Sequence, residues 1–77
     1  MNYEGFFTWL TMEKHMGERS ARDTVSRLRR VLRIVDENAV CDATMQKLNK
    51  TNEFATCSVF VKSQLKRSVR LYQEFEN

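Results

Sequence analysis

The chain contains no proline and only two glycines among its 77 residues. Folds made of strands and tight turns need such residues at short intervals, so their scarcity predicts an all-helical domain. Two cysteines, Cys41 and Cys57, are too few for the disulfide framework of a small secreted scaffold, and we expect buried or half-buried free thiols in a reducing compartment. The only histidine, His15, has no ligands at zinc spacing around it, so we expect no metal and no cofactor.

Long apolar stretches are also missing. Charged residues interrupt every run well before the roughly 20 residues of a membrane span, and the N-terminus lacks the pattern of a signal peptide. We therefore expect a cytoplasmic protein with no membrane association. Because 42% of the residues are hydrophobic, there are enough apolar side chains for one core, and we expect residues 1–77 to form a single domain.

The motifs of catalysis are absent as well. There is no Gly-rich phosphate loop, and no serine or cysteine is paired with His15 in a nucleophilic arrangement. Tyr72 lies in an apolar row of a helix, which predicts a core position rather than a nucleophile. The sequence therefore predicts a domain that is not an enzyme and has no small-molecule substrate.

Apolar spacing predicts two helices in the first half of the chain. The first covers about residues 2–15 and is followed by Gly17, which can adopt positive φ without steric cost. The second begins at Ser20, whose hydroxyl suits an N-cap, and runs to about Asp36. Its inner face consists of Val25, Leu28, Val31, Leu32 and Val35.

Two further helices are predicted in the second half. A short helix begins near Asp42 and passes through Leu48, while Phe54 enters the core from a turn. Whether this third helix is one piece or two stays open. The last helix begins at Ser58. Its predicted inner face consists of Val61, Leu65, Ser68, Tyr72 and Phe75, widened by Val59, Val69 and Leu71.

The positive charge is concentrated in two of these helices. The net charge is only +3, yet residues 19–33 hold six arginines against one aspartate, and residues 62–70 hold four basic residues and no acid. Arginines 22, 29 and 33 share one side of the second helix with Ser26, and Lys62, Lys66 and Arg70 form an i, i+4, i+8 row on the last. Like charges at this spacing repel, which favours a polyanionic partner. The alternative is that long basic side chains merely cover apolar surface with their stems.

The apolar pattern resembles a known family. Phe6-x-x-Trp9-Leu10 on the first helix, followed by a second helix opened by Ser20, resembles the N-terminal SAM-like domain of phage integrases, the core-binding domain of tyrosine recombinases. The segment from Val61 to Tyr72 is similar to the closing helix of that family. The second helix departs from the family in its larger number of arginines, and in having Leu28 or Arg27 where an aromatic is common.

This resemblance covers nearly the whole chain and implies a compact four-helix SAM-like orthogonal bundle. It also implies a DNA-binding module that grips one side of a duplex through the second and last helices during DNA integration and recombination. A separate catalytic domain of the same recombinase would hold the other side and carry the catalytic residues. We expect the isolated domain to be a monomer.

Two functions remain open at this point. The first is binding of double-stranded DNA, mostly through phosphates. Its predicted contact residues are Arg22, Ser26, Arg29, Arg30, Arg33, Lys62, Lys66, Arg67 and Arg70. The second is a stand-alone protein-interaction domain with an acidic partner, for which an exposed Phe7 or Trp9 would be the anchor. Charge reversal at Arg29 and Arg33 abolishes DNA binding under the first hypothesis only.

Overall fold

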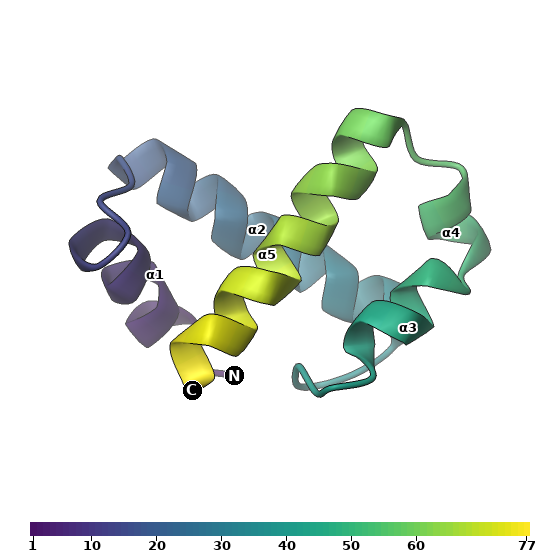
Figure 1. Cartoon of the computed structure of the whole chain (residues 1–77), viewed down its shortest axis with the longest axis horizontal. Coiled ribbons are helices and arrows are strands. Elements are labelled where there is room, and N and C mark those ends of the chain that lie inside the picture. The colour runs from purple at the N-terminus through teal and green to yellow at the C-terminus, as the bar shows by residue number, and fades with distance from the viewer.

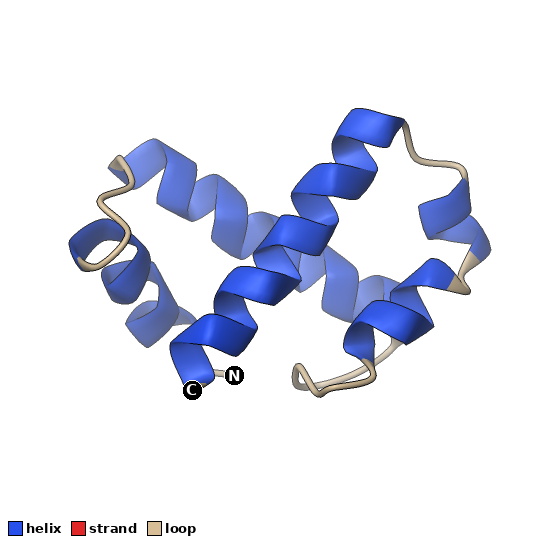
Figure 2. Cartoon of the chain, in the orientation of Figure 1, coloured by secondary structure: helices blue, strands red, loops and turns tan.

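The computed structural model describes residues 1–77, and every regular element in it is a helix (Figure 2). The elements are α1 (Tyr3–Met12), α2 (Glu18–Val35), α3 (Thr44–Asn49), α4 (Asn52–Ala55) and α5 (Val59–Glu76). The predicted all-α class is confirmed. Four of the helices correspond to those predicted, and α4 is an additional single turn that carries Phe54.

The two long helices, α2 and α5, determine the architecture. Each has 18 residues, and α5 crosses in front of α2 in Figure 1. On one side of the crossing α1 packs against both long helices, and on the other side α3 does so with α4 beside it. The molecule measures 34 × 23 × 16 Å, so the crossing forms a slab that is thin along the viewing direction of Figure 1.

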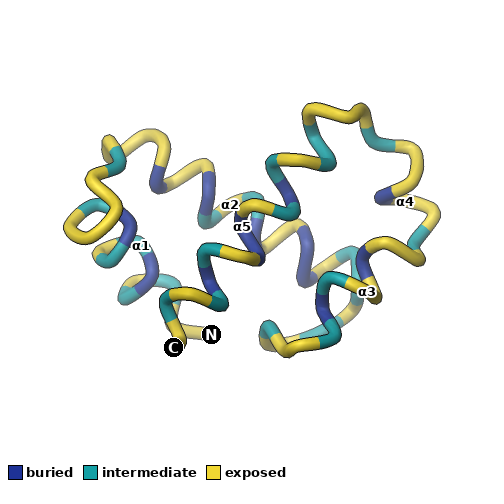
Figure 3. Tube along the Cα trace, viewed as in Figure 1, coloured by how far each residue is buried: buried dark blue, intermediate teal, exposed yellow.

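The core lies where α2 and α5 cross and continues under α1 and α3, as the dark segments of Figure 3 indicate. Phe6 packs edge-on against Tyr72, with ring centroids 4.9 Å apart, so the predicted core position of Tyr72 is confirmed. Full burial of one such side chain contributes about 1.5–3 kcal/mol. The core consists of Phe6, Leu10, Ala21, Leu28, Val31, Leu48, Phe54, Leu65, Val69 and Tyr72.

The connection between α1 and α2 differs from the prediction. The first helix ends at Met12, and His15, not Gly17, adopts the left-handed conformation (φ 54°). Gly17 has φ −63° and is instead the N-cap of α2. The early turn lets Met16 fold back toward α1, where its amide donates to the Leu10 carbonyl and its side chain packs against the core.

The predicted cap of the second helix is also wrong. Ser20 lies inside α2, which begins at Glu18, and the Ser20 carbonyl accepts a hydrogen bond from the Thr24 hydroxyl. The N-cap, Gly17, has no side chain to bond the free amides, whereas the carboxylate of Glu18 suits the positive end of the helix. The predicted end near Asp36 is confirmed, because Asp36 is the C-cap in the left-handed conformation (φ 57°).

The caps of the second half agree better with the sequence. The Ser58 hydroxyl accepts from the Val61 amide at 3.2 Å, as predicted for the start of α5. Asp42 does not cap α3, whose N-cap is Ala43. Val59 is 81% exposed, so its predicted place on the inner face is wrong. The first turn of α5 projects beyond the crossing (Figure 1), and Val59 is not among the residues that pack against the core.

Candidate nucleic-acid interface

Most basic side chains of α2 and α5 have no acidic partner. The chain forms only three ion pairs, Lys14–Glu74, Arg22–Glu18 and Lys47–Glu37. Among the basic residues predicted to contact DNA, Arg22 alone is paired, at 3.1 Å from Glu18. The others have no carboxylate within 4.0 Å. These unpaired cations are Arg29, Arg30, Arg33, Lys62, Lys66, Arg67 and Arg70.

One flank of α2 faces α1. Arg22, Ser26 and Arg29 line a groove of about 540 Å³ together with Tyr3 and Phe7. The Arg29 guanidinium lies 4.6 Å from the centroid of the Tyr3 ring, a cation–π contact that limits its freedom. The structure therefore brings three of the predicted residues together here.

The outer face of α2 points away from α5. Leu28, Val31 and Leu32 are buried, and the 3.6-residue period places Arg30 and Arg33 nearly opposite them. Both arginines are exposed, and Arg30 has a weak contact of 3.8 Å with the Cys57 sulfur. Arg33 extends from the face of α2 opposite the core, whereas the Arg30 side chain reaches toward Cys57, which precedes the N-cap of α5.

On α5, two of the predicted residues lie against α4. The Nζ atoms of Lys62 and Lys66 lie 5.7 and 5.6 Å from the centroid of the Phe54 ring. Both lysines are half-buried, so they do cover apolar surface while keeping their charge at the surface. Arg70, one turn beyond Lys66, is exposed and lies on the outer face of α5.

A hollow of about 300 Å³ lies between α2 and α5, and Arg67 shares it with Arg27. Arg27 is absent from the predicted contact residues because it belongs to neither row of like charges. The signal that would have found it is the polar series Ser20, Asp23 and Arg27, which recurs at helical spacing beside the buried face of α2.

The predicted residues therefore do not form one flat surface. The buried faces of α2 and α5 meet where the helices cross (Figure 1), so exposed cations on the opposite faces, such as Arg33 and Arg70, point away from the crossing. Basic side chains of the two helices share one hollow, which Arg27 of α2 and Arg67 of α5 both line.

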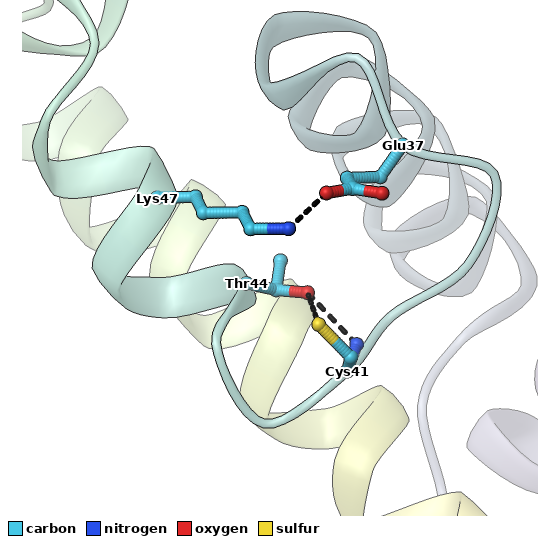
Figure 4. A network of polar contacts seen from close by, with 4 residues as sticks. All are labelled: Glu37, Cys41, Thr44 and Lys47. Atoms are coloured by element: carbon cyan, nitrogen blue, oxygen red, sulfur yellow. Dashed lines mark hydrogen bonds and ion pairs between the residues drawn. The ribbon is translucent and has the colours of Figure 1, made fainter.

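The polar cluster in Figure 4 belongs to the loop between α2 and α3. The Thr44 hydroxyl lies 3.6 Å from the Cys41 sulfur and accepts from the Cys41 amide at 2.8 Å. The bond from Thr44, followed by the Ala43 amide, lowers the pKa of the Cys41 thiol. Nearby, the hydrogen bond to Glu37 raises the pKa of Lys47. These contacts stay within the loop and the start of α3, and they give the cluster a structural role.

The two thiols are both free, but their environments differ from the expectation. Cys57 is half-buried as predicted, whereas Cys41 is exposed. Thr44, which is fully buried, anchors the loop that carries Cys41. Thr44 therefore occupies the buried position of this loop instead of Cys41. No cluster of three or more histidine, cysteine, aspartate or glutamate side chains is present.

The exposed apolar residues are not those expected for a protein-binding anchor. Phe7 and Trp9 are half-buried against the core, and the Trp9 ring centroid lies 5.7 Å from that of Phe75. Instead, Val59 and Phe60 are 81% and 67% exposed at the start of α5.

Comparisons with protein-family models, curated proteins and solved structures find no match to this chain. None of its helices combines the length and the apolar character that crossing a membrane requires. The charges and the geometry of α2 and α5 are therefore the basis for a proposed function.

Proposed function

We propose that this chain is a DNA-binding domain that holds duplex DNA through α2 and α5, as a core-binding module of a tyrosine recombinase does, in the cytoplasm. The observation that carries the proposal is that seven of the predicted contact residues are cations with no acidic partner. The chain has ten acidic residues, yet none lies within ion-pair distance of these seven. A polyanion relieves the repulsion along each row, and the guanidinium fork matches phosphate oxygens.

The positions of these cations favour binding of the duplex at the edge of the molecule where Arg27 and Arg67 line the hollow between α2 and α5. Arg30 and Arg33 extend on one side of this edge, and Lys66 and Arg70 on the other. These two pairs of cations then contact phosphates on either side of the edge. Such contacts set the position of the domain on the duplex. Catalysis is the task of a separate domain of the same recombinase, which is the second partner under this proposal.

Fluorescence anisotropy of a labelled random duplex of about 25 base pairs, titrated at several salt concentrations, tests this function. Because several phosphates are contacted, we expect a log–log salt slope steeper than about −4 and a loss of affinity of roughly a thousandfold between about 50 and 200 mM salt. Absence of binding at the lowest salt concentration would contradict the proposal.

The exposed Val59 and Phe60 favour a second candidate, a domain that associates through the start of α5. Sedimentation equilibrium of the chain and of its Phe60→Ser variant separates the two candidates. DNA binding as proposed predicts a monomer for both chains in the absence of DNA. A dimer that is lost in Phe60→Ser would favour the second candidate.

A further inference from the structure

The hollow between α2 and α5 is lined by one arginine from each helix. Arg27 comes from the middle of α2 and Arg67 from the middle of α5, and the two are 40 positions apart in the sequence. Only the crossing of the helices places them around the same space of about 300 Å³. The fold itself therefore creates this concentration of positive charge.

The charge of this pair is not neutralised within the chain. Asp23 lines the same hollow, one turn before Arg27, but neither arginine forms an ion pair with it. Arg27 is also half-buried, which weakens the screening of its charge by water. Two like charges around one hollow, neither of them paired with Asp23, are a suitable arrangement for a bound anion.

The neutral groups around the hollow are suited to an oxyanion. The Ser20 hydroxyl and the Gln64 amide both line it, and neither side chain makes a hydrogen bond within the chain. Together with the two guanidinium forks, they offer donors from several directions. A tetrahedral phosphate group accepts on all its free oxygens and suits such a donor set better than a planar carboxylate does.

We propose that this hollow is a binding site for a single phosphate group, which Arg27 and Arg67 hold between α2 and α5. The proposal rests on the proposed function in one respect, because it assigns this phosphate to the backbone of the bound duplex. Contact of both long helices with one phosphate also fixes the duplex relative to the crossing. Arg27 then joins the predicted contact residues, and Arg67 acts together with it rather than as a member of the α5 row.

The first experiment measures duplex binding by Arg27→Gln, Arg67→Gln and the double variant. Because both arginines hold the same phosphate, the double variant is expected to lose little more affinity than either single variant. Its salt slope should become shallower by about one, the contribution of one phosphate. Additive losses with a slope change of about two would overturn the shared site. Lys47→Gln with Lys50→Gln removes two exposed charges outside α2 and α5 and is the matched control. Equal binding by the control and the double variant would also overturn it.

The second experiment uses inorganic phosphate alone and follows the Nε–H signals of the arginines and the side-chain amide of Gln64 by NMR. We expect phosphate to shift the signals of Arg27, Arg67 and Gln64 in the unmodified chain, and not the Gln64 signal in the double variant. Unshifted signals at high phosphate would overturn the site. If phosphate binds here but the chain does not bind duplex, the site stands for a free phosphate or phosphomonoester and only the assignment to DNA fails.

Folding is checked separately, because Arg27 is half-buried. Circular dichroism should give the same helical content for all variants. Arg67 is exposed, so Arg67→Gln alone keeps the test valid if replacement of Arg27 disturbs the crossing. Arg67→Lys retains the charge without the fork, and we expect it to recover part of the lost affinity.

Discussion

α2 and α5 have the same length and both carry an excess of positive charge, but their neighbours give their cations different roles. All basic residues of α2 are arginines, and Arg33 extends from the face opposite the core. On α5, Lys62 and Lys66 instead cover the Phe54 ring. A row of charges on a helix therefore has no fixed meaning. The element packed beside the row decides which cations extend freely and which are held against an aromatic ring.

The strongest test of this comparison reverses the charges of each helix in turn. We expect Arg30→Glu with Arg33→Glu, and Lys66→Glu with Arg70→Glu, each to weaken duplex binding by roughly thirtyfold, or about 2 kcal/mol. The four changes together should cost about a thousandfold, since the rows lie on opposite faces and act independently. Arg29 is left unchanged because its guanidinium stacks on Tyr3.

Anisotropy measures these affinities at one salt concentration. If charge reversal on one helix has no effect on duplex affinity, the duplex lies flat on the face of the other helix. The proposed binding at the edge between the two helices is then wrong. Circular dichroism of both double variants serves as the folding control.

A second test asks whether the two helices contribute equally to the core. Leu28 of α2 and Leu65 of α5 are 0% and 1% exposed at the crossing. We expect Leu28→Ala and Leu65→Ala each to lower the free energy of unfolding by roughly 2–5 kcal/mol, because each leaves a cavity. Urea unfolding followed by circular dichroism measures this. Val59→Ala, at an exposed position of α5, should stay within about 0.5 kcal/mol of the unmodified chain.

The N-caps provide a smaller contrast. Ser58 caps α5 through its hydroxyl, whereas Gly17 gives α2 no side-chain cap. Ser58→Ala is expected to lower the free energy of unfolding by about 1 kcal/mol. Gly17→Ser should raise it by about 0.5 kcal/mol, because Gly17 has ordinary β-region dihedrals and no atom within 4 Å of an added Cβ. Thermal unfolding of both variants checks these signs, and a loss of stability in Gly17→Ser would contradict the assigned cap.

The smallest expected effect concerns the thiols that follow α2 and precede α5. Cys41 is exposed and its pKa is lowered by the Thr44 hydroxyl, so it should react faster with iodoacetamide than the half-buried Cys57. A lowered pKa means that the thiolate forms at lower pH, so the rate should rise earlier with pH for Cys41. Thr44→Val removes the hydroxyl and should raise the pKa and slow the reaction near pH about 7.5. Mass spectrometry of each alkylated cysteine gives the two rates, and equal rates would contradict the prediction that Cys41 reacts faster.

Much of the fold follows from sequence pattern. The apolar period of α2 and α5 locates both helices, and the Ser58 cap is correct because a hydroxyl there has no competing partner. The start of α2 is missed because a glycine with ordinary dihedrals takes the cap, and Ser20 is left inside the helix. Val59 is misplaced because periodicity does not reveal where the neighbouring helices end.

The candidate site is predictable only in part. Spacing identifies the cations that share a face of one helix, but it does not tell which neighbour that face meets. Arg29 beside Tyr3 and Lys66 beside Phe54 are consequences of packing between elements. The pair of Arg27 and Arg67 depends on the crossing of two helices, so no local pattern contains it.

The central claim is that both α2 and α5 contact one duplex around their crossing. The most direct measurement is the set of backbone amide shifts of the ¹⁵N-labelled chain when a random duplex of about 25 base pairs is added. If both helices contact the duplex, shifts are expected in two separate segments, around residues 26–33 of α2 and 63–70 of α5, with α3 unaffected. Shifts confined to one of these helices, or to Val59 and Phe60, would contradict it.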